Sequence, residues 1–214
     1  MKLQIKLTLK YQRRQSLFFY SLKCWHGYRN KYVQISNICF INGGKKMNIK
    51  DKYLNFYYET IGEIEEPIID PKKTALLLVD LQNEFVLRDF GEALQFKASG
   101  EWERWIPFHD RLDDIVIPNN KKLLDFFRAN NMAVTYGRIA CLRDDGEDRS
   151  PVQKSEGWNN MLMPVDSYSA QMIDELSPLK NEIVVNKTTD SVCNGTNYLT
   201  LLRFMGIDTV VVTG

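Results

Sequence analysis

The sequence predicts an α/β protein in which a doubly wound parallel sheet lies between two layers of helices. Short apolar runs alternate with helix-like stretches from residue 72 to residue 214. The first run, residues 74–80, is continuously apolar and ends in a carboxylate, as is typical of strands covered on both faces. Right-handed crossovers between such strands build an α/β/α sandwich.

Three further strands are expected at residues 133–139, 182–187 and 209–214. A helix begins near Pro118, because the first turn of a helix tolerates the missing N–H of proline, and ends near Asn130. A second helix is expected from about residue 194 to Met205, with Gly206 as its C-cap. A shorter helix is expected over residues 169–176.

The composition is that of an ordinary soluble protein, with 44% hydrophobic and 26% charged residues. No apolar run of about 18 residues is present, so we expect no membrane partner. The four cysteines are scattered, which favours a reduced, cytoplasmic location over a disulfide scaffold. His109 is the one histidine after residue 46, so no metal site is expected, and no glycine-rich nucleotide motif indicates a cofactor.

The sequence divides into a basic segment, residues 1–46, and a mixed-charge domain, residues 47–214. The basic segment holds ten Lys or Arg and no Asp or Glu, and it has no steady periodicity. Three interpretations remain open: a transit peptide, a basic arm for nucleic acid or an acidic membrane, and a mistranslated leader. We favour the leader, or a disordered extension, because residues 43–46 can be encoded by a purine-rich ribosome-binding site before Met47. We therefore expect no nucleic-acid partner.

Two long inserts, residues 83–113 and 140–168, follow strand ends and are rich in aromatic and charged residues, among them Trp158. Ligands of open α/β sheets bind at the carboxyl ends of the strands, so both inserts are placed to line that crevice. The alternative, that their aromatic side chains form a lid or an oligomer contact, stays open.

Asp80 ends the first expected strand and Lys187 ends the third, so in a parallel sheet both emerge at the same edge. A carboxylate and an ammonium that meet there can keep each other ionised and shift neighbouring pKa values. On this pattern alone, a helix cap or an ordinary ion pair is the simpler interpretation.

Three sequence blocks stand out, at residues 77–85, 185–196 and 206–214. They resemble the isochorismatase-like cysteine hydrolases, above all the amidases such as biuret and N-carbamoylsarcosine amidohydrolases. Residues 77–85 resemble the first strand and turn of that family, residues 185–196 its lysine segment, and residues 206–214 the strand before its nucleophile. The blocks occur in the family's order and together cover residues 72–214.

The resemblance implies hydrolysis of an amide or ureido C–N bond of a small molecule by an Asp–Lys–Cys triad on a Rossmann-like fold. Asp80 would be the general base, and Lys187 would lower the thiol pKa and hold the anionic intermediate. Gln82, Phe85 and Trp158 would help to form the substrate pocket. Relatives are often dimers or tetramers, which implies a homo-oligomer for the full-length domain.

The nucleophilic cysteine is expected a few residues beyond Gly214, so we expect this chain alone to be a truncated, inactive domain. Neither Cys141 nor Cys193 is assigned that role. Cys193 suits a small buried hydrophobic side chain. Cys141 follows the second strand and could line the crevice, but nothing near it in the sequence indicates an activated thiol. With strand order 3-2-1-4 the fourth strand becomes an exposed apolar edge at residues 210–212, which would promote aggregation.

Two other functions remain open. The chain could be part of an isochorismatase proper, which cleaves a vinyl ether, and release of ammonia from ureido compounds would distinguish the two. It could instead be a non-catalytic binding module, although the presence of both Asp80 and Lys187 argues for an enzyme.

Overall fold

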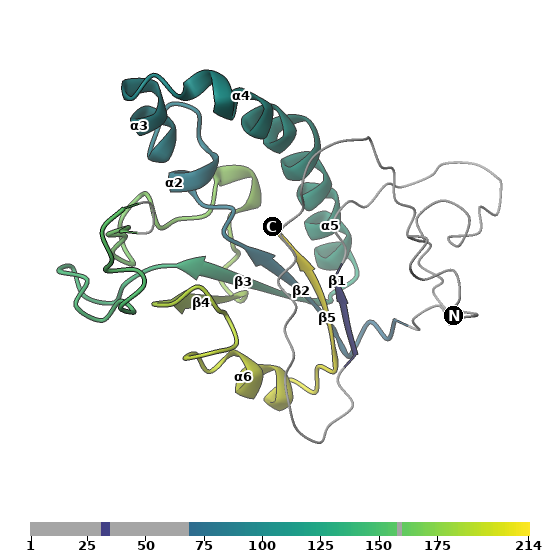
Figure 1. The fold of residues 1–214 in the computed structure, drawn as a ribbon. Coiled ribbons are helices and arrows are strands. Elements are labelled where there is room, and N and C mark those ends of the chain that lie inside the picture. Colours follow the sequence, from purple (N-terminus) through teal and green to yellow (C-terminus); the bar gives the residue numbers. More distant parts are fainter. Residues whose placement is uncertain (1–30, 35–68, 158–159) are drawn as a thin grey trace, which may run out of the picture.

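The computed structural model describes residues 31–34, 69–157 and 160–214. Within them a parallel sheet has five strands in the order β1-β5-β2-β3-β4 (Figure 1). The strands are β1 (Lys31–Gln34), β2 (Thr74–Val79), β3 (Ala133–Ile139), β4 (Ile183–Lys187) and β5 (Thr209–Thr213). The last four have the predicted order 3-2-1-4, which is confirmed.

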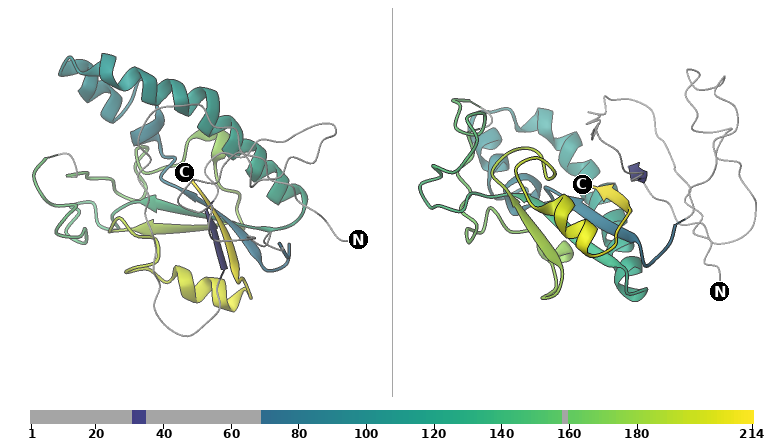
Figure 2. Two further views of the ribbon diagram at one scale, coloured as in Figure 1. Left: turned by 45° about the vertical axis from the view of Figure 1, so that its right-hand side comes forward. Right: turned by 90° about the horizontal axis from the view of Figure 1, so that it is seen from below.

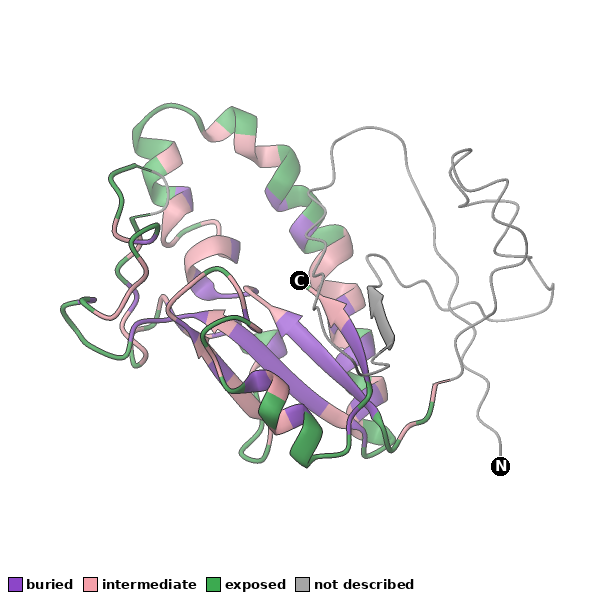
Figure 3. Ribbon diagram, turned by 60° about the horizontal axis from the view of Figure 1, so that its bottom comes forward, coloured by how far each residue is buried: buried purple, intermediate pink, exposed green. Residues whose placement is uncertain are grey.

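The prediction that β5 forms an exposed edge is wrong. Strand β1 pairs with β5 in parallel, with Lys31 opposite Thr209 and Gln34 opposite Val212. Val210 and Val211 are buried, as Figure 3 shows for most of the sheet. The strand lies inside the basic segment 1–46, which the sequence analysis assigned to an extension. The strand was not predicted because four residues are too few to give a periodic signal.

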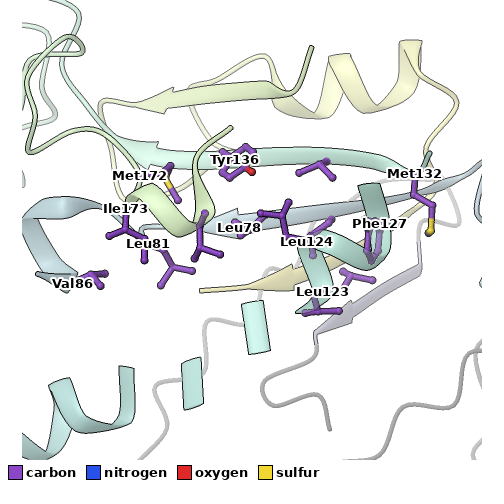
Figure 4. Close-up of a cluster of buried hydrophobic side chains, with 14 of the residues drawn as sticks. Leu78, Leu81, Val86, Leu123, Leu124, Phe127, Met132, Tyr136, Met172 and Ile173 are labelled. Atoms are coloured by element: carbon purple, nitrogen blue, oxygen red, sulfur yellow. The ribbon is translucent and has the colours of Figure 1, made fainter. Parts of the chain in front are cut away.

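Helices cover both faces of the sheet (Figures 1 and 2), as an α/β/α sandwich requires. Helix α5 (Ile117–Ala129) packs on one face and α6 (Tyr198–Phe204) on the other. Side chains along β2 alternate between the two cores. Leu76 and Leu78 join the α5 core, and Ala75 and Leu77 join the α6 core. Figure 4 shows Leu78 beside Leu124 of α5. Burying each leucine stabilises the fold by about 1.5–3 kcal/mol.

The first insert is helical. It contains α2 (Asn83–Val86), α3 (Glu92–Ala98) and α4 (Trp102–Arg111), and a π-helical segment (Leu112–Val116) joins α4 to α5. The helix predicted to begin near Pro118 therefore continues an earlier one. A proline inside a helix lacks the N–H that bonds the carbonyl four residues before, and the π-helical segment lies directly before this defect.

Two predicted helices are shorter than expected. Helix α6 begins at Tyr198 because Gly195 has a φ of +83°, outside the helical region, and Ser191 Oγ accepts bonds from the backbone of the following turn. The C-cap of the helix is Met205, and Gly206, which was predicted for that position, follows it in the left-handed conformation with φ of +69°. Residues 169–176 form only a 3₁₀ turn, Asp174–Leu176, because α2 takes the carbonyls of Ser169 and Gln171 as acceptors.

None of the helices among the described residues is long and apolar enough to cross a membrane.

Candidate active site

Asp80 follows β2 directly, at the carboxyl edge of the sheet. Its backbone has a φ of +55°, a left-handed conformation that is uncommon for residues other than glycine and costs energy. Its N–H donates to the carbonyl of Gly137 in the neighbouring strand at 3.0 Å. The sheet therefore holds the turn in place and directs the Asp80 side chain away from the regular strand geometry.

Lys187 is the last residue of β4 and its side chain is 1% exposed. Strand β3 lies between β4 and β2, so the Lys187 side chain crosses the end of β3 to reach Asp80. Its Nζ donates to Asp80 Oδ2 at 2.7 Å and approaches the carbonyl oxygen of Asp190 at 3.5 Å. The expected meeting of Asp80 and Lys187 at one edge is present in the structure.

The two carboxylate oxygens of Asp80 have different surroundings. Oδ2 accepts from Lys187, whereas Oδ1 is buried and has no hydrogen-bond partner in the described part of the chain. Burial raises the pKa of Asp80 above its ordinary value, the Lys187 ammonium opposes that rise, and the Asp190 carboxylate adds to it. A carboxylate oxygen with no protein partner, on a group of raised pKa, accepts a proton more readily than that of an ordinary aspartate.

The three residues expected to form the substrate pocket have different positions. Gln82 is fully buried, and its amide bonds the backbone of Ile139 through both ends and the carbonyl of Ala170. It joins the ends of β2 and β3 and would shape a pocket only through them. Phe85 is half-buried in α2, between two hydrophobic clusters. Trp158 lies outside the described residues.

The two inserts meet around a cavity of about 230 Å³. The first insert contributes Glu84, Glu92 and Gln95, and the second contributes residues of the segment 157–163. Burial and the nearby Glu84 raise the pKa of Glu92 to about 7, and burial raises the pKa of Glu84 as well. The sequence placed both inserts at this edge but gave no indication of the two carboxylates.

The cysteines of the described segments do not resemble activated nucleophiles. Cys141 is 1% exposed, and its backbone bonds Met163 and Val165 on either side. Burial, together with the nearby Asp148, raises the pKa of the Cys141 thiol, which opposes formation of a thiolate. Cys193 packs against the hydrophobic core beneath α6.

Within residues 31–34, 69–157 and 160–214, no cluster of three His, Cys, Asp or Glu side chains could hold a metal ion. His109, the histidine weighed as a ligand, is buried in α4 beside the rings of Trp102 and Phe108.

One feature of the site gave no sequence signal. Gln153, in the second insert, is fully buried and donates from Nε2 to Asp190 Oδ1 at 3.2 Å. The contact joins residues that are distant in sequence and belong to two irregular loops, so no periodic pattern could indicate it.

Comparison with known proteins identifies the fold and the family. The chain is 31% identical to the N-carbamoylsarcosine amidase of an Arthrobacter species, over 47% of this chain and 39% of the amidase. It is 30% identical to the isochorismatase family protein YwoC of Bacillus subtilis, over 68% of this chain and 65% of YwoC. The chain thus spans less than two thirds of the length of either relative.

A cysteine hydrolase from Pseudomonas syringae pv. phaseolicola has a similar fold, with a TM-score of 0.51 and 23% identity over 67% of this chain and 60% of that one. The model of the isochorismatase domain matches residues 74–214, which include Asp80, Lys187 and four of the five strands. The chain belongs to the isochorismatase family of hydrolases.

Proposed function

We propose that this chain carries two of the three catalytic residues of a cysteine amidohydrolase that cleaves an amide or ureido C–N bond of a small molecule. The observation that carries the proposal is the Asp80–Lys187 pair, in which Lys187 occupies one carboxylate oxygen and leaves the other without a partner. A buried carboxylate oxygen without a protein partner is unfavourable, so stability alone does not account for it.

The third residue, a cysteine, would follow β5 in a polypeptide that continues past Gly214. Support comes from the close approach of β5 to β2. Gly214 has a φ of +155°, and a Cβ there would lie 2.2 Å from the carbonyl oxygen of Val79, the residue before Asp80. A turn that follows Gly214 would therefore start beside the general base.

In the proposed reaction, Asp80 Oδ1 takes the proton of the cysteine thiol, and Lys187 stabilises the resulting negative charge. The thiolate attacks the carbonyl carbon, and the tetrahedral intermediate expels the amine or ammonia, which leaves with the proton from Asp80. Water then attacks the acyl-enzyme while Asp80 accepts one of its protons. The C–S bond breaks, the acid product is released, and the proton from Asp80 regenerates the cysteine thiol.

The amidase relative favours the carbamoyl class of substrate. We expect the enzyme to act in the cytoplasm and to assemble as a homo-oligomer without nucleic acid. Fractionation of native cells and light scattering of the purified enzyme would test these expectations.

The test starts from the gene. The reading frame through and past codon 214 is sequenced, expressed in full and incubated with biuret, N-carbamoyl amino acids and isochorismate. Release of ammonia from a ureido compound, abolished by Asp80→Asn and by replacement of the following cysteine, supports the proposal. Cleavage of isochorismate without ammonia release would establish the vinyl ether hydrolase instead. Absence of any cysteine at that turn leaves the binding module.

A further inference from the structure

The buried amide of Gln153 has an unusual hydrogen-bond pattern. Nε2 donates to Asp190 Oδ1 at 3.2 Å, whereas Oε1 is enclosed and has no partner among the residues that the structure describes. A buried polar atom without a partner is unfavourable, and an apolar side chain of the same shape would avoid that cost. Packing alone therefore does not explain a glutamine here, and its bond to Asp190 is the remaining reason for the amide.

Asp190 lies directly beside the catalytic pair. It follows Lys187 by one short turn, and its carbonyl oxygen is 3.5 Å from Lys187 Nζ. Its carboxylate is exposed to solvent, but Gln153 binds one of the two oxygens. Within the described residues, the charged groups that act on Asp80 are Lys187 and Asp190. The Asp190 carboxylate is thus, beside the Lys187 ammonium, the second charge that acts on Asp80.

Gln153 is itself held in place. Its backbone carbonyl accepts a hydrogen bond from Arg149 Nη1 at 3.0 Å. In the same loop, the N–H of Ser150 donates to the carbonyl of Thr188 at 2.8 Å. The loop that carries Gln153 is therefore attached to the loop that follows Lys187. Because the backbone of this loop is fixed, the Gln153 side chain can hold the exposed Asp190 carboxylate in one position.

We propose that Gln153 is a positioning residue that holds the Asp190 carboxylate on the turn directly after Lys187, where its charge acts on the proposed Lys187–Asp80 catalytic pair. The second part of this inference rests on the proposed function. A like charge nearby disfavours the ionised form of Asp80, so Asp80 binds a proton more readily than it would with Lys187 alone. Without Gln153, the exposed Asp190 side chain would turn toward solvent and its influence on Asp80 would weaken.

The test compares Asp190→Asn and Gln153→Met with Asp208→Asn, whose carboxylate lies at the opposite, amino-terminal edge of the sheet. In each variant of the 214-residue chain, the carboxyl carbon of Asp80 is titrated by NMR and thermal unfolding is recorded. We expect a lower titration midpoint for Asp80 in Asp190→Asn, a smaller shift in the same direction in Gln153→Met, and none in Asp208→Asn. We also expect Gln153→Met to melt at the same or a higher temperature than the wild type.

Two results would overturn the inference. One is an Asp80 midpoint that stays unchanged in both Asp190→Asn and Gln153→Met. The other is a clear loss of thermal stability in Gln153→Met with no shift of the midpoint, which would show a structural role only. The titration needs no turnover, so failure of the complete enzyme to release ammonia would contradict the proposed function and leave the charge coupling standing.

Discussion

Two ion pairs lie near the two ends of β4, and they differ in how completely their hydrogen-bonding groups are used. Glu182, just before the strand, forms a bidentate pair with Arg128 of α5 at 2.8 Å. Arg128 also donates to the carbonyl of Ser177, and Glu182 accepts from Tyr136 and from the N–H of Leu179. Lys187 and Asp80, beyond the other end, share one bond at 2.7 Å and leave Asp80 Oδ1 without a partner.

The difference separates a pair that supports the fold from a pair suited to chemistry. Although burial opposes it, the bonds from Arg128 and Leu179 hold the pKa of Glu182 below its ordinary value, which keeps it ionised. The pKa of Asp80 is raised instead, which makes it a better proton acceptor. A fully satisfied network resists a change of protonation, whereas an incomplete one at a strained residue permits it.

The largest expected effect separates the pairs by activity. In the complete enzyme, Asp80→Asn removes the proposed general base, and we expect kcat to fall roughly 10²- to 10⁴-fold. Glu182→Gln should leave kcat near the wild-type value in a folded sample. Steady-state release of ammonia measures both. A catalytic loss in Glu182→Gln as large as that in Asp80→Asn would break the distinction.

The next largest effect is on stability. Arg128→Met leaves the Glu182 side chain, which is 11% exposed, without its cation, and we expect a loss of about 3–5 kcal/mol in the free energy of unfolding. Urea unfolding followed by circular dichroism measures it. Arg203→Met, on the exposed side of α6, serves as the control and should change stability by about 0.5 kcal/mol at most.

The pH dependence of stability should have opposite signs for the two carboxylates. The folded-state pKa of Glu182 is below its ordinary value of 4.5, so its contribution is present above that pH and is lost as pH falls through the folded value. The folded-state pKa of Asp80 is above its ordinary value of 3.8, so stability falls as pH rises from there through the raised value. The free energy of unfolding is measured across the acidic range for the wild type and each variant. The difference between the wild type and Glu182→Gln should rise with pH, and the difference between the wild type and Asp80→Asn should fall. Equal slopes would contradict the assignment.

The smallest effect sharpens the comparison most. Replacing Asp80 and Lys187 together by Asn and Met removes both charges from the pair, and we expect stability within about 1 kcal/mol of the wild type, or higher. The matching double variant of Arg128 and Glu182 should be clearly less stable, because the neighbouring hydroxyl and backbone groups lose their partners. Parallel urea titrations of the two double variants decide this.

The sequence predicts those features that follow from periodicity and from the geometry of a parallel sheet. The four strands after residue 72 and their order agree with the structure, as does the meeting of Asp80 with Lys187, because residues at the carboxyl ends of parallel strands share one edge. The pairing of β1 with β5 could not be predicted, because a strand of four residues shows no periodic pattern and its partner strand is distant in sequence. The start of α6 depends on local side-chain bonds of Ser191, which override the helical pattern.

The polar details of the site were beyond the sequence for a related reason. The cavity carboxylates Glu84 and Glu92 and the Gln153–Asp190 contact depend on how two irregular loops fold over the sheet. Gln82 is a further residue whose contacts depend on the folded structure. The family resemblance implied a pocket residue, whereas its amide bonds the backbone of two neighbouring segments.

The strand order also has a consequence for how the protein is made. Strand β2 lies at the centre of the sheet, between β3 and β5, yet β5 comes last in sequence among the five described strands. At about 5–20 residues per second, a ribosome takes on the order of 10 s to go from one to the other. During that interval one edge of an apolar central strand has no partner, which makes the nascent chain a candidate client for chaperones that shield hydrophobic strands.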